Sequence, residues 1–129
     1  MEGFGLNIGA VASTIAHDSH NIVVIGTNER DMALACNRLS EIGGGIVLCD
    51  SGFVVSEIPL PIAGLMSDES VESVSERCER FEAELRKRGC SLDAIYTLSF
   101  IALPVIPSLR ITDKGLVDVE RGEVVQVFL

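Results

Sequence analysis

The apolar residues of this 129-residue chain come in short runs, each broken by glycine, proline or a charged residue. No run approaches the roughly 20 residues that a helix needs to cross a bilayer, so the pattern argues against a membrane span. A chain of about 150 residues buries roughly two thirds of its unfolded surface, which is enough for one core. Since no linker, repeat or low-complexity tract divides the sequence, we expect residues 1–129 to form one domain.

Four short runs have the β-branched composition and turn-forming borders of strands. They span residues 11–16, 21–26, 46–49 and 53–58, and two more short strands, 115–119 and 124–128, are expected to close the chain. Asp50, Ser51 and Gly52 separate the third and fourth runs and predict a hairpin. A glycine triplet from Gly43 precedes the third run. Because phosphate-binding loops follow a strand and open a helix, we interpret this triplet as a helix end and tight turn.

Two longer segments show the spacing of amphipathic helices. The first is expected to begin after the N-cap Asn28 and to end at the glycine triplet. The second is expected to begin at Ser67 or Asp68, to end at Gly89, and to expose a face of i,i+4 ion pairs: Glu76 with Arg80, Glu82 with Arg86, and Glu84 with Arg88. We interpret that face as solvated rather than as a binding patch. The fold class is therefore α/β of the α+β type, with a small mixed sheet and two main helices in one domain.

Residues 97–107 form the most apolar segment of the chain. Pro104 and Pro107 exclude a regular central strand through its second half. An exposed apolar patch of this length would favour aggregation. We therefore expect residues 98–106 to be at least half buried, either in the core or against a second copy, which leaves a homo-oligomer open.

The charge of the chain excludes some classes of partner. Nineteen Asp and Glu against ten Lys and Arg give a net charge of −9, which repels a phosphate backbone. Trp is absent and Tyr96 is the single tyrosine, so no aromatic platform for single-stranded bases is indicated. The first residues lack the basic start and continuous apolar stretch of a secretory signal. We expect a cytoplasmic protein that binds neither nucleic acid nor membrane.

The cysteines are spread singly through apolar stretches, without the CxxC pairing of zinc or redox sites; they are Cys36, Cys49, Cys78 and Cys90. A thiol in such a setting packs as a small apolar side chain. We expect the cysteines to be structural.

The only cluster of catalytic-type residues is His17, Asp18, Ser19, His20 and Asn21, which contains both histidines of the chain. A catalytic zinc normally needs three protein ligands, and two histidines with the aspartate supply them only if a tight turn brings all three to one side. A Ser-His-Asp triad is disfavoured, because no nucleophile-elbow sequence surrounds the serine. Three interpretations stay open: a metal site, a contribution to a composite substrate site or interface, and a hydrogen-bonded structural corner.

Several sequence blocks, in this order and spacing, resemble the C-terminal domain of bacterial and archaeal adenine deaminase. The blocks are GFGL at 3–6, AHDSHN at 16–21, GTN at 26–28 with DMA at 31–33, LPIAGLMS at 60–67, and TLSFIALPVIP at 97–107. The resemblance covers nearly the whole chain and fades after Val119.

The resemblance implies a part of a larger enzyme. Adenine deaminases belong to the amidohydrolase superfamily and hydrolyse adenine to hypoxanthine and ammonia at a divalent metal centre, Mn, Fe or Zn, held by a (β/α)₈ barrel. This sequence has no counterpart of that barrel or of its metal ligands. The resemblance therefore implies that the chain is an inactive accessory domain, which shapes or covers a metal site on a barrel in cis or in trans. The segment from His17 to Asn21 is then its candidate substrate-site or interface block.

Two alternatives accompany this hypothesis. One is a free-standing purine-binding or regulatory module without catalysis. The other is an independent hydrolase that uses His17, Asp18 and His20 on a metal of its own.

Overall fold

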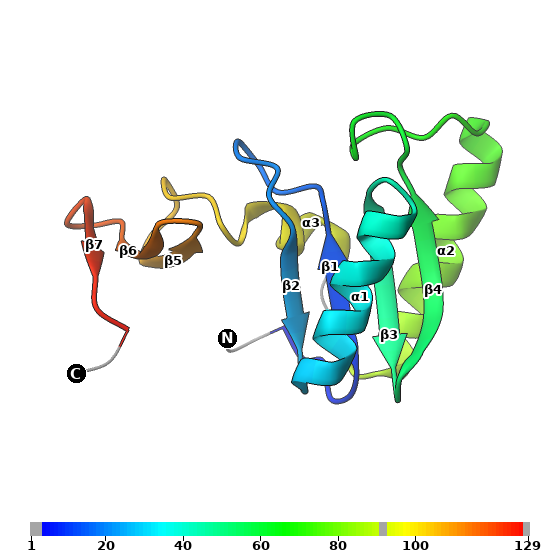
Figure 1. Cartoon of the computed structure of the whole chain (residues 1–129), viewed down its shortest axis with the longest axis horizontal. Coiled ribbons are helices and arrows are strands. Elements are labelled where there is room, and N and C mark those ends of the chain that lie inside the picture. Colours follow the sequence, from blue (N-terminus) through cyan, green and yellow to red (C-terminus); the bar gives the residue numbers. More distant parts are fainter. Residues whose placement is uncertain (1–3, 91–92, 128–129) are drawn as a thin grey trace.

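The computed structural model describes residues 4–90 and 93–127, and its main body is a four-stranded sheet with helices on both faces (Figure 1). The strands are β1 (Ala10–Ser13), β2 (Val23–Gly26), β3 (Gly45–Asp50) and β4 (Phe53–Pro59), in the order β2-β1-β3-β4. Every pair is antiparallel, whereas the sequence pattern predicts a mixed sheet. The reason is the hairpin between β3 and β4 and the short return from β1 to β2, neither of which is a crossover connection. The α+β class is confirmed.

Helix α1 (Glu29–Glu41) covers one face of the sheet. Alternate residues of neighbouring strands point to the same face, and here Ala12, Val47 and Cys49 pack against Ala35 and Leu39 of the helix. The predicted N-cap Asn28 is confirmed, because its side-chain oxygen accepts the main-chain N–H of Asp31 at 2.9 Å. The helix then ends as predicted at the glycine triplet, where Gly43 has φ = +78°.

Asp31 joins the start of α1 to the turn between β3 and β4. Its carboxylate is only 3% exposed and accepts the main-chain N–H groups of Gly52 at 2.8 Å and Ser51 at 3.2 Å. The side-chain amide of Asn28 donates a further hydrogen bond of 2.8 Å. These donors, the Asn28 amide above all, hold the pKa of Asp31 below its usual value against the opposing effect of burial.

Helices α2 (Val71–Lys87) and α3 (Ala94–Phe100) cover the other face. There Phe81 and Leu85 of α2 and Leu98 of α3 join the main core with the strand residues Val11, Ile46, Leu48 and Ile58. Helices therefore cover both faces of the four-stranded sheet, and the interior of the chain lies in this body.

Helix α2 begins later than predicted. Its N-cap is Ser70, whose hydroxyl accepts the N–H of Ser73, and neither Ser67 nor Asp68 has this role. Ser67 instead accepts the N–H of Glu69 at 3.1 Å in the preceding turn.

Two of the three predicted ion pairs along α2 form. They are Glu82 with Arg86 at 2.6 Å and Glu84 with Arg88 at 2.8 Å. In the third, the Arg80 guanidinium donates to the main-chain carbonyl of Glu76 rather than to its carboxylate. No helix in residues 4–90 and 93–127 is long and apolar enough to cross a membrane.

The apolar segment 97–107 divides in two. Its first part forms the second half of α3, where Leu98 is buried, and Leu103 in the following turn is buried as well. From Pro104 onward the segment is exposed. Within one copy of the chain, residues 98–103 are therefore buried or partly buried and residues 104–106 are not. Burial of the last three residues against a second copy stays a prediction.

A second, three-stranded sheet follows and lies apart from the body in Figure 1. Its strands are β5 (Leu109–Thr112), β6 (Gly115–Asp118) and β7 (Glu123–Val125), paired antiparallel in that order. Strand β6 matches the predicted strand 115–119. Strand β7 overlaps the predicted strand 124–128 only at its start, since residues 126 and 127 are not in a strand and residue 128 lies outside the described residues. Strand β5 is not predicted. Between residues 104 and 127 no side chain is buried.

Candidate functional site

Residues 17–21 form one exposed turn between β1 and β2, which we call the polar corner. The main-chain N–H of His20 closes the turn on the carbonyl of Ala16 at 2.7 Å. Asp18 and His20 both have positive φ, at +73° and +50°. The left-handed region costs an ordinary residue roughly 1–2 kcal/mol, so two such residues in one turn require support from neighbouring structure.

Helix α3 supplies part of that support through His17. The main-chain N–H of His17 donates to the carbonyl of Ser99 at 2.6 Å, and its ring stacks on Phe100 with centroids 5.4 Å apart and planes 19° apart. The side chain also contacts Asp18, with 3.0 Å between Nδ1 and Oδ1. Because an ionised carboxylate only accepts, Nδ1 is the donor in this contact, and Nε2 points away from Asp18 as the second ring nitrogen.

An aromatic cluster borders the polar corner. Tyr96 lies one helical turn before Phe100, and their rings are tilted by 51° with centroids 4.8 Å apart. Tyr96 is 66% exposed. The sequence pattern predicts that the apolar segment 97–107, which contains Phe100, lies in the core or at an oligomer contact. It does not predict that Phe100 lies beside His17. The i,i+4 spacing of Tyr96 and Phe100 is a local signal for their pairing, but no local signal indicates that His17, 83 positions before Phe100, stacks on it.

The polar corner brings its five predicted residues into one turn but does not assemble them into a catalytic set. In the described part of the chain, no three His, Cys, Asp or Glu side chains lie where they could hold a metal ion. His17 is engaged with Asp18 and Phe100, and no hydrogen bond recorded for the described residues joins Ser19 to either histidine. The arrangement offers hydrogen-bonding groups and aromatic contacts.

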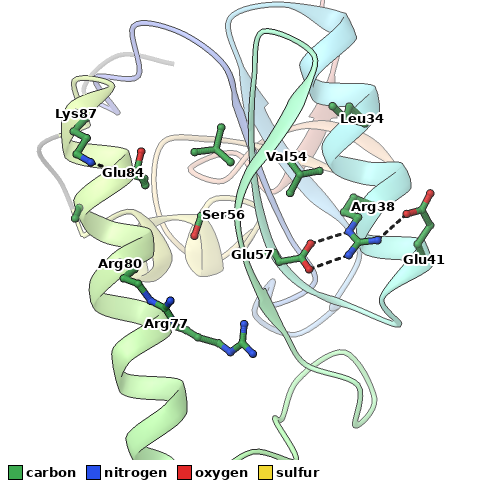
Figure 2. A pocket seen from close by; sticks show the side chains of 12 residues that line it. Leu34, Arg38, Glu41, Val54, Ser56, Glu57, Arg77, Arg80, Glu84 and Lys87 are labelled. Atoms are coloured by element: carbon green, nitrogen blue, oxygen red, sulfur yellow. Dashed lines mark hydrogen bonds and ion pairs between the residues drawn. The ribbon is translucent and has the colours of Figure 1, made fainter.

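A groove of about 820 Å³ lies elsewhere on the body, along β4 between α1 and α2 (Figure 2). It is lined by Leu34, Arg38, Glu41, Val54, Val55, Ser56, Glu57, Arg77, Arg80, Ala83, Glu84 and Lys87. Two residues of the α2 face that was expected to be solvated, Arg80 and Glu84, therefore belong to one wall of this groove. Figure 2 shows Arg77 and Arg80 reaching in from α2, opposite Arg38 and Glu57.

Most charges of the groove are paired with a neighbouring carboxylate, guanidinium or ammonium group, Arg77 with Glu69 at 2.8 Å among them, whereas Arg80 donates to the main-chain carbonyl of Glu76. Arg38 donates to both carboxylate oxygens of Glu57 at 2.7 and 2.9 Å, and this contact holds the pKa of Glu57 below its usual value. Lys87 contacts Glu84 at 2.6 Å and, together with Arg88, lowers the pKa of that carboxyl. An anionic ligand would have to displace these pairs, so the groove is a weaker candidate binding site than the polar corner.

The thiols outside these sites are poor nucleophiles. Burial raises the pKa of the Cys36 and Cys78 thiols, and it raises that of Cys49 to about 11. Because the thiolate is the reactive form, these side chains act as small apolar groups, in agreement with their expected structural role.

Comparison with known proteins agrees with the sequence blocks. Residues 1–123 match the family model described as the adenine deaminase C-terminal domain. Adenine deaminase of Archaeoglobus fulgidus is 55% identical over 128 residues, which is 98% of this chain and 23% of that protein. Those of Kosmotoga olearia and Brucella melitensis are 50% and 53% identical over 130 and 126 residues, 100% and 97% of this chain and 22% of each protein. The chain thus spans less than a quarter of the length of these relatives.

Proposed function

The chain belongs to the adenine deaminase C-terminal domain family, and we propose that it is the accessory domain of an adenine deaminase whose catalytic site lies elsewhere in the enzyme. In this proposal the domain helps to shape or cover a metal site on a barrel domain, in cis or in trans. Adenine is the substrate of the whole enzyme, and hypoxanthine and ammonia are its products. We place that enzyme in the amidohydrolase superfamily and in the cytoplasm.

The exposed, supported position of His17 carries the proposal. Ordinary turns use Gly, Asn, Asp or Ser at lower cost than histidine. Here an imidazole is fixed at the surface by Asp18 on one side and Phe100 on the other. A carboxylate that fixes the tautomer of a histidine is a recurrent arrangement around catalytic centres. Nε2 of His17 is then oriented to accept a hydrogen bond from a partner, such as the exocyclic amine of adenine or a main-chain N–H of a barrel loop.

The divalent metal of the proposal, Mn, Fe or Zn, belongs to the barrel domain. Among the residues that the structure describes, no three His, Cys, Asp or Glu side chains lie where they could hold a metal ion by themselves. His17, Asp18 and His20 are therefore proposed to contact substrate or a loop and not the ion.

A deaminase chimaera tests the proposal. It is the Archaeoglobus fulgidus enzyme with its matching C-terminal segment replaced by these 129 residues. His17→Ala and His20→Ala in the chimaera are expected to lower kcat/KM by roughly 10- to 100-fold, with the melting temperature unchanged. Glu72→Ala, at an exposed position of α2, is the control and should leave both values unchanged.

The outcomes separate the open interpretations of the polar corner. A lower melting temperature with normal turnover per folded molecule would assign the corner a structural role only. A parent chimaera that releases no ammonia from adenine, while the unaltered relative does so, would contradict the accessory-domain proposal. The purified 129-residue chain alone should release none.

A second candidate function is a purine-binding module, and the exposed ring of Tyr96 favours it. An aromatic side chain contributes about 1–3 kcal/mol when a base stacks on it. Calorimetric titration of the isolated chain with adenine tests this function. Heat of binding that disappears in the Tyr96→Ala variant would support a purine-binding module, and no heat at millimolar adenine would exclude it.

A further inference from the structure

The three strands after residue 104 carry a largely apolar face, and none of its residues is buried in the part of the chain that the structure describes. In the register of the sheet, Ile111 lies opposite Leu116, and Leu116 lies opposite Val125. Residues directly opposite one another in antiparallel strands share a face, and so do residues two apart on one strand. Leu109 therefore lies on the same face as Ile111, and Asp118 and Glu123, which follow Leu109 across the sheet, form the acidic end of that face. We call Leu109, Ile111, Leu116 and Val125 the docking face.

The opposite face of this sheet has fewer apolar side chains. It carries Arg110, Val117 and Val124, which lie opposite one another across the three strands, and Thr112 at its end. Val124 is 60% exposed, against 74% for Ile111. The two positions are similar in exposure and in β-branched shape, and they differ in the face on which they lie.

This sheet cannot be stable through its own interior. A sheet of this size needs one apolar face packed on another layer. In the body, α1, α2 and α3 provide such layers, but no side chain between residues 104 and 127 is buried. We propose that the docking face packs against the remaining polypeptide of the deaminase, the part that lies outside this domain. The inference rests on the accessory-domain role proposed above.

Length and charge favour that occupant over a second copy. The relatives continue over more than three quarters of their length beyond the matched segment, so a partner surface is present in the same polypeptide. A segment in the same chain has an effective concentration near millimolar. Two copies of this chain would each bring a net charge of −9, which opposes their association.

Amide hydrogen exchange tests the docking face, measured on the isolated chain and on the deaminase chimaera. The amides of β5 and β6 should exchange at least about tenfold more slowly in the chimaera, because docking closes their local openings. Ile111→Ser in the chimaera should restore the fast exchange, whereas the matched control Val124→Ser should not. Ile111→Ser should leave the melting temperature of the isolated chain unchanged, which checks that the substitution does not disturb folding.

Three results would overturn the inference. The first is equal exchange of β5 and β6 in the two proteins. The second is an effect of Val124→Ser equal to that of Ile111→Ser. The third is exchange of β5 and β6 in the isolated chain that slows as the protein concentration is raised, together with a doubling of the mass measured by light scattering. That result would assign the docking face to a second copy. If His17→Ala leaves kcat/KM of the chimaera unchanged while β5 and β6 stay protected from exchange, only the proposed role of the polar corner is contradicted. Failure of that role and failure of the docking face are therefore distinguishable.

Discussion

The body of this chain and its C-terminal sheet are both made of short antiparallel strands, but only the body contains an interior. Strand β3 in the body has apolar residues on both faces, and helices cover both. Strand β6 in the C-terminal sheet also has apolar residues, Leu116 and Val117, yet both stay partly exposed. The pattern of apolar residues in the sequence predicts where strands form. Whether a sheet is stable by itself depends on the helices or other layer packed on its apolar face.

The largest expected effect comes from removing a covering side chain of the body. Phe81 of α2 is fully buried against the sheet. Phe81→Ala should destabilise the isolated chain by about 3–5 kcal/mol, because it leaves a cavity in the main core. Urea denaturation followed by circular dichroism measures the change. The control is Phe53→Ala at an exposed position of β4, which should stay within about 0.5 kcal/mol.

A loss below about 1 kcal/mol for Phe81→Ala would contradict the comparison. It would mean that α2 contributes little to the body and that both sheets depend on an outside partner.

The next effect concerns Asp31, the buried acid that joins α1 to the β3–β4 turn. Asp31→Ala leaves the main-chain N–H groups of Ser51 and Gly52 without their acceptor. The expected loss is about 1–3 kcal/mol for buried donors left unsatisfied. Thermal unfolding at pH 7 measures it, with Asp68→Ala at an exposed position as the control. Equal melting temperatures for the two variants would show that water replaces the carboxylate at no cost.

The same carboxylate makes the stability of the body depend on pH. The pKa of Asp31 is lower in the folded chain than in the unfolded chain, so the unfolded state binds the proton more readily. Its contribution is complete above the unfolded value near 4 and is lost as pH falls through the folded pKa. The Asp31→Asn variant should therefore lose less stability than the parent chain between pH 6 and pH 3. Parallel losses in urea titrations at the two pH values would assign the acid sensitivity to other carboxyl groups.

The smallest expected change in stability comes from replacing isoleucine by valine. The same substitution can be made in both sheets, so it compares them most directly. Ile46→Val in β3 should cost about 0.5–1.5 kcal/mol, because Ile46 is buried in the main core. Ile111→Val in β5 removes the same methylene from an exposed position and should give no measurable change in the isolated chain. Equal costs in a denaturation series would show that the isolated chain already covers β5.

Local signals explain which elements could be predicted from the sequence. Asn28 as an N-cap and the glycine triplet as a helix end depend on residues within one turn, and both are confirmed. The predicted start of α2 is wrong because Ser67, Asp68 and Ser70 are all residue types that cap helices. Which of them is the N-cap depends on the fold of the preceding turn, and in the structure it is Ser70. Strand β5 is missed because it is four residues long and follows directly on a proline-containing turn.

The candidate site was predictable to the same extent. His17, Asp18, Ser19, His20 and Asn21 are adjacent in sequence, so their common turn follows from chain connectivity, and their role in a substrate site stays a prediction. Their aromatic neighbours come from α3. The stacking of His17 on Phe100 depends on how α3 packs under the sheet, which no short-range pattern contains.

The paired charges along the β4 groove determine how the chain behaves in concentrated solution. A free edge strand invites pairing with another molecule, and charged side chains beside it oppose that pairing. Arg38 with Glu57 and Lys87 with Glu84 border β4 in this way. At the docking face the ion pairs are longer, 3.6 and 3.7 Å from Arg121 to Asp118 and Glu123, and they lie at the turn between β6 and β7, away from Ile111 of β5. Near the isoelectric point of about 4.6, where the charge repulsion between copies vanishes, precipitation of the isolated domain should therefore begin at β5–β7 and leave the β4 edge unpaired.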